Sequence, residues 1–425
     1  MTTTFALLGA PPFITRALER RGITEPFDIQ IATIRDGLAG RDVCGRAPTG
    51  SGKTLAFGVP LIARTDQHGR SAPHRPRALV LAPTRELAEQ ITAELRSFSG
   101  RVRVDAVYGG VGYGPQLTAL RRGVDVVVAC PGRLEDLIER GDVTLADVDH
   151  VVVDEADRMA DMGFLPAVRR ILDQTAGDRQ TVLFSATLDD DVAKLTRDYQ
   201  RDPVRHEVGD STPNIKAAEH RFVKLERMAR NDAVAEVING AWPSIVFTRT
   251  RHGADRLAMQ LGKLGFEAAA IHGGRSQSQR NRALDGFAGG GVHALVATDV
   301  AARGIHVDGV ASVIHYDPPE DHKAYTHRSG RTARAGAEGL DVSMVQPEQV
   351  RDTHTLIRTL DLAAEILDWQ AGERPAVATV EPVARRTERR DERPVEQRER
   401  RNGPDAGRND RRPRRRRQTA GRRRY

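Results

Sequence analysis

The order of hydrophobic and polar positions predicts two long alternations of β-strands and α-helices. Short apolar runs rich in β-branched residues predict strands buried on both faces of a parallel sheet, and the stretches between them follow helical spacing. The predicted strands of the first half are Asp42–Arg46, Ala78–Ala82, Val124–Ala129, His150–Asp154 and Thr181–Ser185. Those of the second half are Ser244–Phe247, Ala268–Ile271, His293–Ala297, Ser312–His315 and Asp341–Val345. The predicted helices include Arg85–Phe98, Leu134–Glu139, Arg251–Leu264 and Gln277–Phe287.

This alternation predicts an α/β fold with two doubly wound parallel sheets, each in a domain of its own. A helix-bearing N-terminal segment, residues 5–30, precedes the first alternation. The polar stretch Arg201–Glu219 contains two prolines and a glycine, and we expect a flexible linker there. The predicted domains are therefore residues 1–209 and 210–372.

The basic charge of the chain is concentrated at its C-terminal end. Between Val383 and Tyr425 there are 18 Arg and 7 acidic residues, a net charge of +11. The whole chain carries +7, so residues 1–382 carry −4. Few apolar residues follow Gly372, and a segment that cannot bury a core is predicted to be disordered. We expect residues 373–425 to form a disordered Arg-rich tail that tethers nucleic acid through salt-sensitive contacts, or else a solubilising extension.

Composition narrows the class of protein further. A chain of 425 residues with 39% hydrophobic residues can form two or three globular domains. No apolar run is long enough to cross a bilayer, and the first residues lack the pattern of a signal peptide. The two cysteines, Cys44 and Cys130, cannot build a disulfide framework or a thiolate metal site. We expect a monomeric, cytoplasmic protein with no membrane partner.

Residues 47–54, Ala-Pro-Thr-Gly-Ser-Gly-Lys-Thr, follow a predicted strand and precede an apolar helical run. This is the arrangement of a P-loop with Ala for the first Gly, in which glycines let backbone N–H groups approach a phosphate chain. Lys53 would reach the β- and γ-phosphates, and the Thr54 hydroxyl would contact Mg²⁺. The predicted nucleotide-binding residues of this loop are Thr49, Gly50, Ser51, Gly52, Lys53 and Thr54.

A second stretch joins a buried strand to several carboxylates. Val151, Val152 and Val153 run directly into Asp154-Glu155-Ala156-Asp157. Ligands of open α/β sheets bind at the carboxyl ends of the strands, so a bound ligand could compensate the negative charge of these carboxylates. With a P-loop in the same domain, we predict that Asp154 holds Mg²⁺, which favours one or two carboxylates plus phosphate oxygens. Glu155 is predicted to take a proton from the attacking water. A solvated acidic turn is the alternative.

The P-loop followed by Asp154-Glu155-Ala156-Asp157 resembles the DEAD-box RNA helicases of superfamily 2, over about residues 5–345. The resemblance implies two tandem RecA-like domains, with ATP and Mg²⁺ as cofactors and RNA as partner. It also implies that Phe5 and residues 22–30 read adenine, with the Gln30 amide in bidentate contact with the base edge. Ile23 stands where an aromatic residue is common in the family.

Three short motifs of the first domain match the family's RNA-contacting motifs. Thr84 and Arg85 open a helix directly after a strand, where N–H groups and a guanidinium can bind a phosphate. Cys130 takes the place of the Thr that usually precedes the third motif. The RNA-binding residues that the resemblance implies here are Pro83, Thr84, Arg85, Gly110, Pro131, Gly132 and Arg133.

The second domain carries the remaining family patterns, at residues 247–250, 277–280 and 297–305. They imply RNA contacts for Arg249, Thr298 and Gly304, and they imply that Asp299 lies near the ATP ribose. His306 replaces the Asp that is usual after Gly-Ile.

Residues 327–336 complete the resemblance. Arg331 and Arg334 are three residues apart, and on a helical turn they would share a face and aim two guanidiniums at the γ-phosphate. An arginine finger of this kind contributes roughly 10³–10⁵ in rate. The resemblance further implies that four residues couple the ATP state to strand separation: Asp157, Ser185, Thr187 and His327.

Together these features predict an ATP-dependent RNA helicase whose catalytic parts, Lys53, Asp154, Glu155, Arg331 and Arg334, are divided between two domains. ATP and RNA together would close the two domains, and this closure would assemble the site. RNA would be held through its backbone and 2′-hydroxyls, without sequence specificity. Two alternatives stay open at this point: a DNA helicase or translocase, and a non-catalytic ATP-gated RNA clamp or scaffold.

Overall fold

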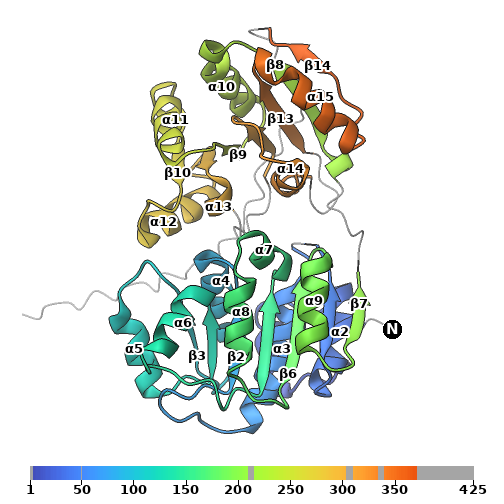
Figure 1. Cartoon of the computed structure of the whole chain (residues 1–425), viewed down its shortest axis with the longest axis vertical. Coiled ribbons are helices and arrows are strands. Elements are labelled where there is room, and N and C mark those ends of the chain that lie inside the picture. Colours follow the sequence, from blue (N-terminus) through green and yellow to red (C-terminus); the bar gives the residue numbers. More distant parts are fainter. Residues whose placement is uncertain (1–2, 49, 209–214, 303–309, 334–338, 371–425) are drawn as a thin grey trace, which may run out of the picture. The chain divides into compact units, whose positions relative to one another are not determined.

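The protein is described by a computed structural model, in which residues 3–48, 50–208, 215–302, 310–333 and 339–370 are placed. Two α/β domains each contain a seven-stranded sheet, and every pair of neighbouring strands is parallel (Figure 1). This confirms the predicted fold class. The predicted tail, residues 373–425, and the centre of the predicted linker, residues 209–214, lie outside the described residues.

The sheet of the first domain has the strand order β3-β4-β2-β5-β6-β1-β7. Its strands are β1 (Val43–Arg46), β2 (Ala78–Leu81), β3 (Val104–Val107), β4 (Val126–Ala129), β5 (His150–Asp154), β6 (Gln180–Ser185) and β7 (Val204–Glu207). The helices with side chains packed on one face are α1 (Pro12–Glu19), α2 (Asp28–Leu38), α3 (Lys53–Gln67) and α4 (Arg85–Phe98). Those packed on the other face are α5 (Tyr113–Arg122), α6 (Pro131–Glu139), α7 (Ala156–Asp161), α8 (Leu165–Leu172) and α9 (Asp190–Tyr199).

Strand β5 lies at the centre of this sheet, and its central position explains why three valines follow one another in its sequence. Val152 packs into the apolar cluster beneath α1 to α4, whereas Val151 and Val153 pack into the cluster beneath α5 to α9. Each of the three is fully buried, and burial of a valine stabilises the fold by about 1.5–3 kcal/mol. A strand covered on both faces therefore needs apolar residues at successive positions, and it carries Asp154 to the carboxyl edge of the sheet.

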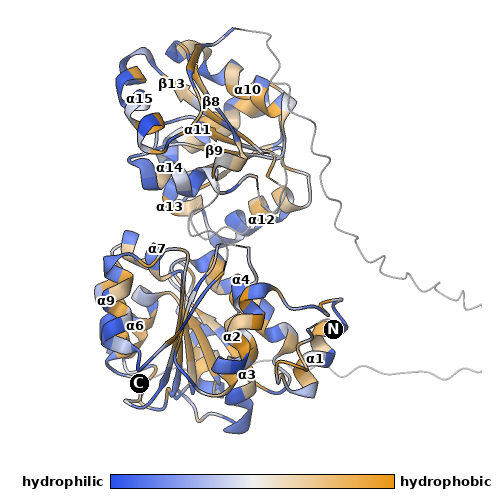
Figure 2. Cartoon of the chain, turned by 90° about the vertical axis from the view of Figure 1, so that its right-hand side faces the viewer, coloured by the Kyte–Doolittle hydropathy of each residue, from blue (hydrophilic) through white to orange (hydrophobic). Residues whose placement is uncertain are grey.

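The sheet of the second domain has the strand order β10-β11-β9-β12-β13-β8-β14. Its strands are β8 (Glu219–Lys224), β9 (Ser244–Phe247), β10 (Ala268–Ile271), β11 (Ala294–Ala297), β12 (Ser312–His315), β13 (Leu340–Val345) and β14 (Ile366–Asp368). Its helices are α10 (Arg230–Gly240), α11 (Arg251–Lys263), α12 (Gln277–Ala288), α13 (Asp299–Ala302), α14 (His322–Ser329) and α15 (Val350–Thr359). Helices α10 and α11 pack on one face, and α12 to α15 on the other. Hydrophobic residues concentrate in the sheets, as Figure 2 shows.

Four strands escaped the sequence interpretation: β3, β7, β8 and β14. The predicted linker Arg201–Glu219 was wrong at its start, because residues 204–207 form β7, which pairs with β1 at the edge of the first sheet. Along β7 the exposed residues Arg205 and Glu207 alternate with half-buried ones. An edge strand with an alternating polar face does not produce the continuous apolar run by which buried strands were identified.

Candidate nucleotide and nucleic-acid site

The P-loop connects β1 to the start of α3. Gly50 and Gly52 have φ angles of 87° and 84°, in the left-handed region that favours glycine. Helix α3 begins at Lys53 without a side-chain cap, so N–H groups of its first turn are left for a ligand. The Lys53 side chain is buried, and its Nζ donates to the Ala47 carbonyl oxygen at 3.1 Å. Thr49, predicted to contact the nucleotide, lies outside the described residues.

Gln30 is held against this loop. Its Nε2 donates to the Gly52 carbonyl oxygen at 2.9 Å, and its Oε1 accepts from the Phe27 backbone N–H at 3.0 Å. A Cβ at residue 52 would lie 2.3 Å from Gln30 Nε2, so the contact requires glycine there. Each end of the amide retains one further hydrogen-bonding position, which is the chemistry that a base edge needs.

Two other residues of the predicted adenine-reading group pack in or against the core of the first domain, and their contact with adenine stays a prediction. Phe5 is 3% exposed and belongs to the apolar core of the first domain. Ile23 is half-buried against the same core. Phe27, by contrast, is 62% exposed, and its ring edge would lie 2.7 Å from a Cβ at residue 52. Phe27 belongs to the predicted segment of residues 22–30 but was given no role of its own; an aromatic residue at the cap of the helix that carries Gln30 was the available signal.

Asp154 ends β5, which lies two strands away from the P-loop strand in the order β5-β6-β1. Its side chain is buried, and burial raises its pKa, whereas the charge of Lys53 acts to lower it. Glu155 adopts a φ of 53°, uncommon for a residue with a side chain, and its carboxylate pairs with Arg158 Nη1 at 2.6 Å. Such backbone strain, of about 1–3 kcal/mol, clusters at functional sites.

Asp157 contacts both hydroxyl residues of the predicted coupling motif. The Thr187 hydroxyl donates to the Asp157 carboxylate at 3.3 Å, and the Thr187 and Ala186 backbone N–H groups donate to the same oxygen. Ser185 Oγ accepts from the Asp157 backbone N–H at 3.1 Å. The ends of β5 and β6 are therefore tied together at the carboxyl edge of the sheet.

The first two predicted RNA-contacting motifs lie against each other. Thr84 caps α4 by accepting from the Leu87 N–H at 3.3 Å, which places Arg85 in the first turn of that helix. The Arg85 guanidinium covers Gly110, since a Cβ at residue 110 would lie 1.9 Å from Arg85 Nη1. Gly110 also has a left-handed φ of 79°.

The third motif joins this group through Arg133. Its Nη2 donates to the Val111 carbonyl oxygen at 3.2 Å, and its guanidinium lies 4.1 Å from the centre of the Tyr113 ring. Pro131 is the first residue of α6, and Gly132 is exposed beside it. The N-cap residue Cys130 makes no side-chain cap hydrogen bond, and burial raises the pKa of its thiol to about 12. The three motifs follow β2, β3 and β4, which are neighbours in the sheet.

In the second domain, Asp299 is already paired. Arg328 donates from Nε and Nη2 to the two carboxylate oxygens of Asp299, each at 2.6 Å. Thr298 is buried at the end of β11, and Arg249 is exposed after β9, with its backbone N–H donating to Asp317. Gly304 lies outside the described residues.

Arg331 does not lie on a helical face, so the predicted face shared with Arg334 is wrong at Arg331. Helix α14 ends at Ser329, and Thr332 instead forms a β-bridge with Val310. Arg331 is buried beyond the helix, and His327 is half-buried in its last turn. Arg334 lies outside the described residues, so its place relative to Arg331 stays a prediction.

Mg²⁺ at Asp154 and Thr54 agrees with the chemistry of the donors. Among the placed residues, no group of three or more His, Cys, Asp or Glu side chains could hold a metal ion. One buried carboxylate and one half-buried hydroxyl suit a cation that takes its other ligands from phosphate and water. No described helix is both long and apolar enough to span a bilayer.

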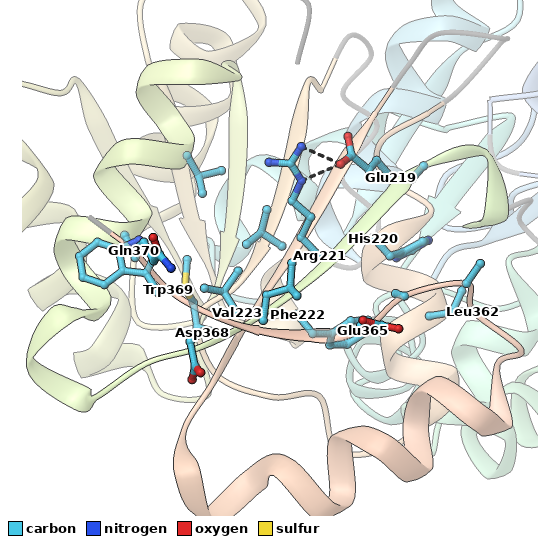
Figure 3. A pocket seen from close by; sticks show the side chains of 18 of the residues that line it. Glu219, His220, Arg221, Phe222, Val223, Leu362, Glu365, Asp368, Trp369 and Gln370 are labelled. Atoms are coloured by element: carbon cyan, nitrogen blue, oxygen red, sulfur yellow. Dashed lines mark hydrogen bonds and ion pairs between the residues drawn. The ribbon is translucent and has the colours of Figure 1, made fainter. Parts of the chain in front are cut away.

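A hollow of about 1100 Å³ lies elsewhere, on β8, β14 and α10 of the second domain (Figure 3). Glu219 and Arg221 pair beside it at 2.6 Å, and Trp369 lies at its edge. None of its lining residues is a predicted site residue. The candidate site is therefore the carboxyl edge of each sheet.

Comparison with known proteins agrees with this geometry. Residues 27–195 match the family described as DEAD/DEAH box helicase, and residues 229–336 match the helicase conserved C-terminal domain. The chain is 41% identical over 391 residues to "DEAD-box ATP-dependent RNA helicase 3A, chloroplastic" of Zea mays, covering 89% of this chain and 52% of the relative. It is 39% identical over 381 residues to "ATP-dependent RNA helicase DBP2" of Ajellomyces capsulatus, covering 87% of this chain and 70% of that protein.

Among solved structures, S. cerevisiae Dbp5 bound to RNA and ADP BeF3 is similar with a TM-score of 0.72 and 26% identity. The match covers 86% of this chain and 95% of that one. The chain spans between 52% and 63% of the length of the first curated relatives that it matches.

Proposed function

The chain belongs to the DEAD-box family of ATP-dependent RNA helicases, and we propose that it hydrolyses ATP to separate or remodel short RNA duplexes or RNA–protein complexes. One observation carries this proposal: the P-loop, Asp154-Glu155 and the three motifs around Gly110 all follow strands at the carboxyl edge of one sheet. In open α/β sheets that edge is where ligands bind. A change at the predicted nucleotide-binding loops can therefore be passed through this edge of the sheet to the predicted RNA-contacting motifs.

In this mechanism Gln30 reads the adenine edge, and Lys53 with the loop N–H groups holds the β- and γ-phosphates. Thr54 and Asp154 would hold Mg²⁺, which neutralises developing charge on the phosphates when it is bound. Glu155 accepts the proton of the attacking water. Arg331 and Arg334 supply positive charge to the γ-phosphate. Asp157, Ser185, Thr187 and His327 couple these events to RNA.

RNA is held through its backbone, because the groups available for it are N–H donors, guanidiniums and glycines rather than side chains that read base edges. In the first domain these groups are Pro83, Thr84, Arg85, Gly110, Pro131, Gly132 and Arg133. In the second they are Arg249, Thr298 and Gly304. The expected consequence is unwinding without sequence preference.

ATPase stimulation tests the proposal directly. The full chain should hydrolyse ATP faster with single-stranded RNA than with DNA of the same sequence and length. Lys53→Ala should abolish that stimulated turnover, because the phosphate chain loses its buried cation. Lys263→Ala, at the end of α11, is the matched control and should retain it. Equal or greater stimulation by DNA would favour a DNA helicase.

The Glu155→Gln variant distinguishes a helicase from a non-catalytic clamp. The substitution removes the proposed base but keeps the shape of the side chain, so the variant should bind ATP and RNA together and fail at multiple turnover. Unwinding of a short duplex at the wild-type rate by this variant would refute the role of Glu155. Wild-type protein that binds both ligands without releasing phosphate would favour the clamp.

Several narrower expectations belong to the same proposal. Domain boundaries at residues 209/210 and 372/373 follow from the sequence pattern. Two free cysteines agree with a reducing cytoplasm, where we place the protein as a monomer. Crosslinking of the Glu155→Gln variant to cellular RNA would identify the RNA on which the protein acts.

A further inference from the structure

A chain of six polar side chains runs through the second domain behind Asp299. Its members come from five elements, and three of the six residues, His315, Tyr325 and Asp341, are 0% exposed. Figure 3 labels the member at the end opposite Asp299, His220 on β8. A buried charged group costs several kcal/mol unless it is paired and hydrogen-bonded, so an arrangement of this kind has to satisfy every proton. The six residues are His220, Tyr325, Asp341, His315, Arg328 and Asp299.

Asp341, on β13, is the negative centre of the chain. Its Oδ2 lies 3.0 Å from His315 Nε2, and its Oδ1 accepts from the Tyr325 hydroxyl at 3.0 Å. Burial alone would raise the pKa of Asp341, but the two histidines near it lower that pKa below its usual range. Asp341 is therefore a carboxylate, and a carboxylate only accepts hydrogen bonds.

The proton positions on His220 follow from its partners. Its Nε2 lies 2.6 Å from the Ile215 carbonyl oxygen, which only accepts, so Nε2 carries a proton. Its Nδ1 lies 2.8 Å from the Tyr325 hydroxyl, which gives its single proton to Asp341. Nδ1 must then donate as well. His220 is a cation, and although burial acts to lower its pKa, the Asp341 carboxylate raises it.

His315 is fixed in one neutral form by the same reasoning. Its Nε2 donates to Asp341, which leaves Nδ1 as an acceptor for Arg328 Nη1 at 3.4 Å. Burial lowers the pKa of His315, in agreement with a neutral ring, and the ring stacks on Tyr325 with centroids 4.6 Å apart. If the His315 proton moved to Nδ1, two donors would face each other, the Nδ1–H of His315 and the Nη1 N–H of Arg328.

Arg328 is consequently held from every side. Its Nη1 also donates to the Asp317 carbonyl oxygen at 2.8 Å, and Nε and Nη2 form the two bonds to Asp299. The Arg328 side chain is 2% exposed, whereas that of Asp299 is 28% exposed. The hydrogen-bonded chain of side chains thus begins at His220, a buried cation, and ends at Asp299, a carboxylate that a ligand can reach.

We propose that His315 and Asp341 are positioning residues for nucleotide recognition: they hold the Arg328 guanidinium in one orientation, and it presents Asp299 to the ribose of ATP. This rests on the proposed function, in which Asp299 lies near the ribose. The Asp341 charge sets the proton on His315, His315 sets the direction of Arg328, and the two-pronged bond to Asp299 fixes that carboxylate.

Discrimination between ATP and 2′-deoxy-ATP tests the proposal, because a general loss of stability would not change the ratio of kcat/KM for the two nucleotides. His315→Leu and Asp341→Asn should each reduce the preference for ATP about tenfold, towards equal use, since a hydrogen bond to a charged group is lost. His315→Gln should restore part of the preference, because its amide can accept from Arg328 and donate to Asp341.

Tyr325→Phe is the matched control. It removes a hydrogen bond from the same buried chain, on the side of Asp341 away from Arg328, and it should lower the melting temperature while the preference for ATP is retained. If His315→Leu does not fold, Asp341→Asn and His315→Gln carry the test.

The outcomes separate this inference from the proposed function. Wild-type protein without RNA-stimulated ATPase activity would overturn the function itself. An active wild type that prefers ATP, with variants of His315 and Asp341 that keep the full preference, would overturn only the positioning role. An active wild type that uses both nucleotides equally would overturn it too, because Asp299 would then make no ribose contact.

Discussion

The Arg85 guanidinium lies directly over the α-carbon of Gly110, so closely that a methyl group at residue 110 would meet Arg85 Nη1 at 1.9 Å. Arg85 follows β2 and Gly110 follows β3, and the two strands flank β4 in the sheet. The contact therefore joins two segments far apart in sequence into one surface with a positive charge and accessible backbone.

Gly110→Ala should weaken RNA binding at least about tenfold, because the new methyl group displaces Arg85 and residue 110 also needs a left-handed φ of 79°. ATPase activity without RNA and the KM for ATP should be unchanged. Fluorescence anisotropy with a labelled single strand, together with steady-state ATPase assays, measures both. Gly109→Ala is the control: a Cβ there meets nothing within 4 Å, and RNA affinity should persist. Equal loss in the two variants would show that Arg85 and Gly110 do not act as a pair.

Phe27→Ala should raise the KM for ATP about fivefold or more while kcat is retained, because the exposed ring beside Gln30 and Gly52 is placed to stack on the base. Stacking of a base on an aromatic side chain contributes about 1–3 kcal/mol. Ile23, at the position where the family commonly has an aromatic, is packed against the core. Steady-state ATPase assays at saturating RNA give both constants.

Ile31→Ala provides the comparison for this variant, since Ile31 is a 38% exposed apolar residue on the same helix α2. It should leave the KM for ATP unchanged. A rise in KM of the same size in both variants would mean that the helix, and not the ring of Phe27, is responsible.

The central strands and the loops after them could be predicted from sequence, because burial and backbone conformation at each position restrict which residues can stand there. Val151, Val152 and Val153 are buried on both faces, and Gly50 and Gly52 adopt the left-handed φ that a phosphate-binding loop needs. The contacts between segments could not be predicted. Nothing in the local pattern pairs Arg328 with Asp299, or places Phe5 in the core while Phe27 is exposed, because these depend on which strands become neighbours.

Truncation after Gly372 should weaken RNA binding and flatten its dependence on salt, because 18 arginines between Val383 and Tyr425 are removed. For single strands, log Kobs falls with log[salt] with a slope of about −0.7 for each phosphate that is neutralised. ATPase activity without RNA should be unaffected. Binding titrations at several salt concentrations measure the slope. A tail of the same composition in shuffled order should restore it, and an unchanged slope in the truncated protein would mean that the tail does not contact RNA.

His150 should make the first domain labile to acid. It begins β5, is 2% exposed, and neither ring nitrogen has a hydrogen-bond partner among the described residues. Burial, followed by the charges of Arg64 and His68, lowers its pKa to about 3. The unfolded chain, with an ordinary pKa of about 6.5, then binds a proton that the folded protein does not. Below about pH 6.5 the free energy of unfolding should therefore fall by up to about 1.4 kcal/mol per pH unit.

His150→Leu removes the loss of stability that protonation of His150 in the unfolded chain causes. The difference in unfolding free energy between the variant and the wild type should therefore grow to about 2 kcal/mol from neutral pH to pH 5. The variant should be no less stable at pH 7.5, because it also removes unsatisfied ring nitrogens from the core. Urea titrations followed by circular dichroism report both domains. Tryptophan fluorescence reports the second alone, since Trp242 and Trp369 both lie there. His252→Leu, at an exposed position, should parallel the wild type, and a parallel curve for His150→Leu would show that His150 is protonated in the folded domain.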